Sequence, residues 1–381
     1  MKIVLSGVET NNKGAELMLY AILQEIERKY PKAVVYLSSE GVKQGISYIH
    51  TSLDLRFLPF GVFVKKAHLL GIFRRLHLPS KYLQDIYGIS SADFFIDASG
   101  FHFSDQKKNF TPEKVWKWER LLKRLNKQGC KIVFLPQAFG PVSKVNTIKG
   151  LKTISRYSNL IIPREQVSYN YLSNSKVVDM SKVRIFSDFT SLVEGVFPSK
   201  YEHLRGAVCI IPNLRMIDTG AISKKNYIDI LSSLAKRAMM LGYSVFLLNH
   251  EGKKDEQLAF ECRKHIGKDV EVVTGLNALE VKGIISSSYL VVTSRFHGLA
   301  SALNSCVPAL ATSWSHKYEE LYRDYKLEGF LLPLDNAQES VSMFENLLEK
   351  EENTRIRQLL SEQVKFVKAQ TRTMWNLIWA L

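Results

Sequence analysis

The stretch that decides the fold most clearly is VVTSRFHGLASAL, at residues 291–303. Its first residues are β-branched and apolar, which is typical of a buried strand, and we expect this strand to end at Ser294. Its last residues are small and apolar, which favours a helix that begins near Leu299. A strand that runs into a helix through a short turn is the repeating unit of parallel α/β sheets.

The same alternation extends from this stretch in both directions along the chain. Short apolar segments bounded by polar loops indicate buried strands, and longer segments such as 227–241 indicate the helices between them. The expected strands lie at 2–6, 34–38, 94–98, 131–136, 160–162 and 183–186, and then at 207–211, 244–248, 270–273, 289–293 and 308–312. The pattern therefore predicts an α/β protein with two Rossmann-like, doubly wound domains that face a cleft.

The length supports two domains, because 381 residues exceed what one hydrophobic core usually organises. Glycine, proline and charged residues interrupt both halves of the pattern in the segment 188–205. We therefore expect an N-terminal Rossmann-like domain over residues 1–195 and a C-terminal one over residues 196–365. The last segment, 366–381, is expected to form a helix that packs back on the protein.

Composition excludes several classes of protein. The chain is 46% apolar, and its four cysteines are far apart, so neither disorder nor a disulfide or zinc framework is indicated. No segment is apolar enough for a secretory leader or a membrane span, so we expect a cytoplasmic protein. We expect no metal, because the nine histidines are scattered without an H-E-x-x-H motif, and we expect that no cofactor is required.

The net charge of +15 implies an anionic partner, which can be nucleic acid, an anionic membrane face or a phosphorylated substrate. Nucleic acid is disfavoured because no DNA- or RNA-binding motif is present. The stretch 56–81 has six basic and no acidic residues, interleaved with aromatic and aliphatic ones. This mixture fits peripheral docking at the inner face of the cytoplasmic membrane, and it equally fits an insertion that packs on its own domain.

The turn at the end of the 289–293 strand carries the best candidates for chemistry. Ligands of parallel sheets gather at the carboxyl ends of strands, where Arg295, His297 and Gly298 are expected. A guanidinium can hold a carboxylate or phosphate, imidazole transfers protons near neutral pH, and glycine lets the backbone approach a bound group. The structural alternative is a salt bridge at Arg295 and a satisfied buried imidazole at His297, but the position at a strand end favours function.

Two further cations follow strand ends. Lys317 lies in the loop after the 308–312 strand, and Arg164 lies just past the 160–162 strand of the first half. Taken singly, each is more often a surface charge. Cations presented by both domains toward the expected cleft would concentrate a small polyanion there.

These residues together resemble the signature of the polysaccharide pyruvyl transferase family. The likeness rests on the Ser294-Arg295-Phe296-His297-Gly298 turn with the small-residue helix after it, on Val307-Pro308 and on Lys317. The loop 7–16 and the Arg164-Glu165-x-x-Ser168 segment also resemble family motifs, so the likeness spans most of the chain.

The resemblance implies a fold like the two-domain type B glycosyltransferases. It also implies transfer of the enolpyruvyl group of phosphoenolpyruvate to two hydroxyls of a sugar, which gives a cyclic pyruvate ketal and phosphate. We expect phosphoenolpyruvate to act as co-substrate, His297 to act as acid and base, and a set of residues to bind the donor. The expected donor-binding residues are Arg164, Arg295, His297, Gly298 and Lys317.

The acceptor side is expected to use polar residues of the first half. The segment 95–102 has a single glycine where family members often have a glycine-rich turn, and this difference concerns the identity of the acceptor and not the donor chemistry. A lipid-linked glycan of capsule or exopolysaccharide assembly would suit the basic surface. The residues that we assign to acceptor binding are Asn11, Asn12, Glu16, Asp97, Ser99, His102 and Gln137.

Two other functions stay open from the sequence. One is a type B glycosyltransferase that uses a nucleotide sugar, since the architecture would be shared and the missing Asp-x-Asp motif discriminates weakly. The other is a noncatalytic module that binds anions through its excess of Lys and Arg.

Overall fold

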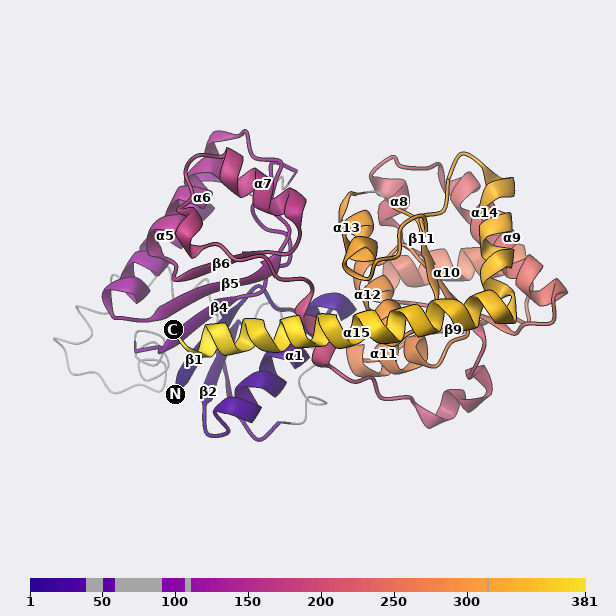
Figure 1. The fold of residues 1–381 in the computed structure, drawn as a ribbon, viewed down its shortest axis with the longest axis horizontal. Coiled ribbons are helices and arrows are strands. Elements are labelled where there is room, and N and C mark those ends of the chain that lie inside the picture. The colour runs from indigo at the N-terminus through magenta and orange to yellow at the C-terminus, as the bar shows by residue number, and fades with distance from the viewer. Residues whose placement is uncertain (39–50, 59–90, 107–110, 314) are drawn as a thin grey trace. The chain divides into compact units, whose positions relative to one another are not determined.

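We analysed a computed structural model that describes residues 1–38, 51–58, 91–106, 111–313 and 315–381. The chain divides into two compact units (Figure 1). Unit 1 comprises Met1–Asn11, Met18–Phe189 and Arg372–Leu381, and unit 2 comprises Asn12–Leu17 and Thr190–Thr371. The first turn of helix α1 (Lys13–Lys29) therefore belongs with unit 2, although the rest of that helix belongs with unit 1.

Unit 1 is built on a six-stranded parallel sheet with the order β3-β2-β1-β4-β5-β6. Apart from the edge strand β3, its strands are mostly buried and apolar because helices cover the sheet. They are β1 (Lys2–Ser6), β2 (Val34–Ser38), β3 (Asp54–Leu58), β4 (Phe94–Asp97), β5 (Lys131–Gln137) and β6 (Leu160–Pro163). Register pairs Ile3 with Phe94 and Phe94 with Lys131.

The prediction of a strand at 183–186 is wrong, and the sequence analysis did not predict β3. Val183 makes an isolated bridge to Ile161, and the N–H groups of Arg184 and Phe186 donate to the carbonyls of Ile161 and Pro163. The segment therefore touches the edge of β6 without forming a strand. Strand β3 is an edge strand in which charged Asp54 and Arg56 alternate with Leu55 and Phe57, and that polar alternation hid it from a search for apolar runs.

Amphipathic helices cover the sheet of unit 1. Helix α5 (Pro112–Lys127) buries Val115, Leu121, Leu122 and Leu125, and Thr111 caps its first turn through the Lys114 N–H. Helix α6 (Val145–Tyr157) packs against α5, and Figure 1 shows both on one face of the sheet. Further helical segments are α7 (Gln166–Asn174) and the short turns Met180–Lys182 and Phe189–Leu192.

Unit 2 is built on a five-stranded parallel sheet with the order β11-β10-β7-β8-β9. The strands are β7 (Val208–Ile211), β8 (Val245–Leu248), β9 (Glu271–Val273), β10 (Leu290–Thr293) and β11 (Ala309–Ala311), each inside the range expected from the sequence. Its helices are α8 (Arg215–Asp218), α9 (Lys224–Met240), α10 (Gly252–Ile266), α11 (Ala278–Ser286), α12 (Phe296–Asn304), α13 (Lys317–Asp324) and α14 (Ala337–Leu348), with a short turn at Ser199–Leu204.

The last helix, α15 (Lys350–Trp379), begins well before residue 366, where we expected a helix to start. Its final turns belong to unit 1, where Trp375 is fully buried and stacks on Trp379 with 5.5 Å between ring centroids. Trp379 also meets Tyr30 and Phe94 edge to face at 5.4 Å. Such ring pairs add to the free energy gained by burial, so they fix the end of the helix on unit 1.

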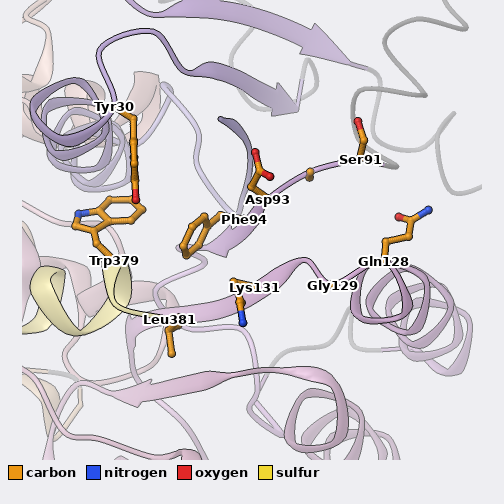
Figure 2. Close-up of a pocket in the computed structure, with 10 residues that line it drawn as sticks. Tyr30, Ser91, Asp93, Phe94, Gln128, Gly129, Lys131, Trp379 and Leu381 are labelled. Carbon is orange, nitrogen blue, oxygen red and sulfur yellow. The ribbon is translucent and has the colours of Figure 1, made fainter.

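A pocket of about 620 Å³ lies beside this helix end (Figure 2). Phe94 and Lys131 line it, so it opens at the amino ends of β4 and β5. The residues that we predicted for catalysis and binding follow the carboxyl ends of strands, and they do not line this pocket. Of the basic stretch 56–81, residues 59–81 lie outside the described residues. In the described part of the chain, no helix has the length and apolarity needed to span a membrane.

Candidate functional site

The carboxyl edge of the unit 2 sheet gathers histidines, acids and an arginine into one cluster. Arg295 and His297 follow β10, with Arg295 at the N-cap of α12 and His297 in its first turn. Three more residues follow β8 at the start of α10, because β8 and β10 both pair with β7. We call the set the His–Arg cluster: His250, Glu251, Asp255, Arg295 and His297.

Within the cluster, the Arg295 guanidinium binds two carboxylates. Its Nε donates to Asp255 Oδ2 over 2.8 Å, its Nη2 contacts the same oxygen, and its Nη1 pairs with Glu251. The Asp255 side chain is 3% exposed, whereas that of Glu251 is 33% exposed. The salt bridge that the sequence offered as a structural alternative is therefore present, and any anion that binds Arg295 must compete with Glu251 or Asp255.

Burial shifts the pKa of the charged members of the cluster. Desolvation raises the pKa of Asp255 and lowers that of Arg295 to about 10, which leaves the guanidinium charged at neutral pH. The pKa of His250 falls well below 6.5, first through burial and then through the positive charges of Arg295, His297 and Lys13. His250 is therefore a neutral imidazole at neutral pH, and its buried Nδ1 has no hydrogen-bond partner among the described residues.

The first turn of α1 packs against this cluster. Asn12 donates from Nδ2 to Glu251 Oε1 over 3.0 Å, and its Oδ1 accepts the Gly14 N–H over 2.9 Å. A Cβ at Gly14 would lie 2.2 Å from Nδ1 of His297, closer than any side chain can approach. Glycine at this position is therefore what allows the helix to meet the imidazole.

Glu16 is fully buried in the same turn. Its Oε2 accepts from Lys13 Nζ over 2.6 Å, and its Oε1 accepts the N–H of Ala278 over 3.3 Å, at the start of α11. The structure therefore places Asn12 and Glu16, which we assigned to the acceptor, beside the residues that we assigned to the donor. Asn11, the other residue of that loop, is exposed and belongs to unit 1.

Gly298 serves the protein's own packing. A Cβ there would lie 2.7 Å from Thr293 Oγ1 and 3.2 Å from Ile211 Cδ1. The close approach expected at this glycine is therefore to the ends of β10 and β7. It lets α12 start immediately after the strand, and this fixes where Arg295 and His297 point.

Lys317 lies next to the His–Arg cluster through the ring of Phe296. Its Nζ is 5.7 Å from the centre of that ring and 5.4 Å from the centre of the Tyr318 ring. Phe296 in turn meets His297 edge to face at 5.2 Å. The sequence therefore located Lys317 correctly as a neighbour of the Arg295 turn, at the first position of α13.

Unit 1 holds a separate group of predicted residues at the carboxyl edge of its own sheet. Asp97 ends β4 and is fully buried, where it accepts from Ser99 Oγ over 2.9 Å and from Gln137 Nε2 over 3.4 Å. Burial raises its pKa to about 6, although the hydrogen bonds from Ser99, Ser6 and Gln137 oppose this shift. Asp97, Ser99 and Gln137 thus form one hydrogen-bonded group, with a carboxyl that titrates near neutrality.

Arg164 also lies in unit 1, directly after β6. Its backbone N–H donates to Gln137 O over 3.0 Å, and the residue is buried. The rest of the Arg164-Glu165-x-x-Ser168 segment is structural. Glu165 caps α7 by accepting from Ser168, and Ser168 Oγ accepts the Phe139 N–H over 2.7 Å, which ties the helix to the end of β5.

His102 lies among aromatic rings. Its ring centroid is 5.2 Å from that of Phe103 and 5.7 Å from that of Trp118, a residue of α5. The predicted residues of unit 1 therefore include a hydrogen-bonded group around Asp97 and an imidazole that packs on the aromatic core.

Sequence reasoning missed part of the His–Arg cluster and its neighbours. His250, Glu251 and Asp255 were overlooked, although a strand was expected directly before them and the rule about carboxyl ends applies there too. Gly14 and Lys13 carried no local signal, because their role depends on contact with residues far along the chain. Within the described residues, His, Cys, Asp and Glu form no group of three or more that could hold a metal ion.

Solved structures with this architecture are numerous, and they show the fold alone because their identity to the chain is low. The Anabaena protein HepE, in complex with UDP and glucose, is 12% identical over 100% of both chains with a TM-score of 0.63. The Neisseria meningitidis UDP-GlcNAc 2-epimerase bound to UDP-GlcNAc is 12% identical over 100% of both chains with a TM-score of 0.61. The chain therefore has two parallel-sheet α/β domains of the type B glycosyltransferase kind.

Sequence comparison identifies the family. A search of the curated proteins found no significant match. The family model for polysaccharide pyruvyl transferase matches residues 12–316, which is most of the chain and includes the Arg295 turn, Arg164 and the first turn of α1. The chain therefore belongs to the polysaccharide pyruvyl transferase family, and it is a transferase.

Proposed function

We propose that this protein transfers the enolpyruvyl group of phosphoenolpyruvate to two hydroxyls of one sugar in a glycan. The products are a cyclic pyruvate ketal and inorganic phosphate. The observation that carries the proposal is the His–Arg cluster, which places an imidazole and a guanidinium at the start of α12 inside the region that matches the family. The family match favours this reaction over transfer from a nucleotide sugar.

Phosphoenolpyruvate needs fixed cations because it carries a carboxylate and a phosphate close together. Unit 2 brings three cations to this region. Arg295 precedes His297 by two residues, Lys317 lies against the ring of Phe296, and Lys13 precedes Gly14, which meets His297. Each charge-assisted hydrogen bond to the donor would contribute roughly 1.5 to 3 kcal/mol. We assign donor binding to Arg295, Lys317 and His297, with Lys13 as an addition and Gly298 as the residue that positions the Arg295 turn. Arg164 of unit 1 remains a predicted donor ligand.

Arg295 can bind the donor by exchanging one carboxylate for another anion. Glu251 is the partner that would leave, because its side chain is the more exposed of the two and is held otherwise by a single bond from Asn12. Asp255 is almost fully buried and would stay, so it keeps the guanidinium oriented throughout. In this scheme Glu251 occupies the place of the donor anion until phosphoenolpyruvate arrives.

The chemistry assigned to His297 is proton transfer. Protonation of the methylene carbon makes the neighbouring carbon electrophilic, and the first sugar hydroxyl attacks it and loses its proton. The second hydroxyl then displaces phosphate, and its proton leaves with that product. One proton thus ends on the new methyl group and one on phosphate, so His297 returns to its starting state after each turnover.

The acceptor is proposed to be a lipid-linked glycan of capsule or exopolysaccharide assembly. The Asp97, Ser99 and Gln137 group offers acceptors and donors for sugar hydroxyls, and a carboxyl with a pKa of about 6 can also take a proton. Asn11 and His102 are the other residues of unit 1 that we predicted for this side, whereas Asn12 and Glu16, predicted with them, lie beside the donor residues of unit 2. Phosphoenolpyruvate is the co-substrate in this proposal, which requires no metal.

The test combines phosphate release with thermal stability. Purified protein is given phosphoenolpyruvate and a panel of free and lipid-linked glycans, and released phosphate is measured. His297→Ala should lower turnover about a hundredfold or more, because it removes the proton-transfer group. His265→Ala, at an exposed position of α10, is the matched control and should retain activity.

Ligand binding separates the two enzyme hypotheses. Phosphoenolpyruvate should raise the melting temperature and UDP-sugars should not, because only a ligand of the native state stabilises it. Stabilisation by UDP-sugars alone, with no phosphate release from any acceptor, would rule out the proposal. Normal turnover by the His297→Ala variant would remove this residue from the mechanism.

A further inference from the structure

Helices α5 and α6 present an unusually basic surface. Seven exposed lysines and arginines lie on them. Arg156, in the last turn of α6, lies over the ring of Tyr157, and none of the other six forms an ion pair with another described residue. The acids of the two helices are Glu113, which pairs with Lys117 over 2.5 Å, and Glu119. We call the six residues the basic face: Lys114, Arg120, Lys123, Lys127, Lys149 and Lys152.

Exposed apolar side chains accompany these charges. Trp116 is 51% exposed on α5, and the Arg120 guanidinium lies 4.5 Å from the centre of its ring. Val145 is 65% exposed at the first position of α6. A tryptophan exposed among cations is typical of proteins that sit at a lipid headgroup layer, where the ring enters the interface and the cations meet phosphates.

The topology places these apolar side chains at one end of the basic face. Helices α5 and α6 pack side by side on one face of the sheet (Figure 1). Each follows a strand, β4 or β5, so both begin at the carboxyl edge of the sheet, where Asp97 and Gln137 also lie. Val145 is the first residue of α6 and Trp116 is the fifth of α5, so both lie near the helix ends that begin at the edge with the predicted acceptor residues.

We propose that the basic face, with Trp116 and Val145, docks unit 1 on an anionic phospholipid surface. The lipid link of the acceptor belongs to the proposed function, and docking there would bring the Asp97 edge toward a lipid-linked glycan. Each basic residue near an anionic leaflet strengthens binding about fivefold, and six of them with a tryptophan suffice for reversible attachment. Binding by such a face weakens as salt screens the charges.

The experiment is sedimentation of the full-length protein with vesicles. Wild type should bind vesicles of phosphatidylglycerol and phosphatidylcholine, should not bind phosphatidylcholine alone, and should be released by added salt. A triple variant, Lys114→Glu with Lys123→Glu and Lys149→Glu, should bind more than about a hundredfold more weakly. Its melting temperature is measured alongside, so that loss of fold is not mistaken for loss of docking.

Matched variants separate a local surface from overall charge. The control triple, Lys225→Glu with Lys236→Glu and Lys264→Glu, changes the net charge equally at exposed positions of unit 2, and should bind as wild type does. Trp116→Ala should weaken vesicle binding several-fold, whereas Met240→Ala, at a position 75% exposed on α9, should not. Equal binding by both triples would overturn the proposal.

Two further results would also overturn it. One is that soluble dextran sulfate binds the basic face as tightly as vesicles do, while Trp116→Ala weakens binding to neither dextran sulfate nor vesicles. The face would then be a site for soluble polyanions and not for membranes. The other is that the wild-type protein does not sediment with anionic vesicles, which would exclude docking. Phosphate release with a soluble glycan is measured on the same samples, and it should be unchanged in the triple variant. Failure of docking with normal release, or docking without release, therefore distinguishes this proposal from the proposed function.

Discussion

At the scale of single residues, the ion pairs of Arg295 decide how the donor can bind. The guanidinium already holds Asp255 and Glu251, so its positive charge is offset before any ligand arrives. The Arg295 turn, considered from the sequence alone, suggests an arginine with no carboxylate partner that is free to bind an anion. The structure instead indicates a receptor with an internal competitor, and this changes what substitution at Glu251 should do.

Glu251→Gln should lower the KM for phosphoenolpyruvate about fivefold, equivalent to ~1 kcal/mol for a partly exposed ion pair. The glutamine amide can still accept from Asn12, but it no longer competes as an anion for Arg295. Steady-state phosphate release measures the effect. Glu256→Gln, on the same helix, removes an equal charge and should leave KM unchanged. An increase in KM for Glu251→Gln would contradict the exchange of anions at Arg295.

His250 should make stability depend on pH. Its pKa is lowered in the folded state, so the unfolded chain binds more protons near and below pH 6.5. The free energy of unfolding should therefore be highest above pH 6.5 and should fall as pH falls, by up to about 1.4 kcal/mol per pH unit. His250→Gln should flatten this slope in urea unfolding, and His265→Gln should not. Identical slopes for wild type and His250→Gln would show that His250 does not titrate as described.

At the scale of secondary structure elements, the contact between α1 and α12 positions the imidazole. Gly14 lets the first turn of α1 lie against His297, and Gly298 lets α12 begin directly after β10. Each glycine removes a side chain that would collide with its neighbour. Together they hold His297 between two helix starts, which limits the directions its ring can take.

Gly14→Ala tests this arrangement. Alanine favours helix by about 1 kcal/mol over glycine, so a purely local view expects a more stable protein. Because the new Cβ would collide with the His297 ring, we expect turnover to drop at least about tenfold. The double variant Gly14→Ala with His297→Ala should be no worse than His297→Ala alone, since both changes act through one group. An additive loss would show that Gly14 acts elsewhere.

At the scale of the whole molecule, each unit has its own core and its own group of polar residues at a sheet edge. The core of unit 1 gathers around Phe95, Phe103 and Phe134, and that of unit 2 around Ile210, Phe246 and Val291. The His–Arg cluster lies in unit 2 and the Asp97 group in unit 1. A small donor that binds at the cluster should therefore slow hydrogen exchange mainly in unit 2.

Hydrogen exchange measured with and without phosphoenolpyruvate can locate the segments that the donor protects. We expect slower exchange at residues 12–17, 250–255 and 293–298, because binding stabilises the native contacts around the donor. Residues 149–157 of α6 should be unaffected. Added protection at residues 163–166 would support a donor role for Arg164. Protection confined to β4 and β5 would place the donor in unit 1 and contradict the assignment.

The sequence by itself determined the two parallel sheets and the turn that carries Arg295 and His297. Apolar runs and strand-to-helix junctions are local, so nearly every buried strand and the place of Lys317 could be predicted from them. The edge strand β3 could not be predicted in this way, because edge strands can carry polar residues. The segment at Val183 resembles a strand in sequence but forms only an isolated bridge, which an apolar run does not reveal.

The tertiary structure alone decided what surrounds the reactive side chains. Asn12 meets Glu251 across 239 residues of sequence, and Gly14 meets His297 over a longer separation still. Such contacts follow from how strands of one sheet are ordered, since β8 and β10 become neighbours of β7 only when the sheet forms. The pairing of Arg295 with buried Asp255 and partly exposed Glu251, and the neutral state of His250, depend on that assembly, because burial and proximity set both.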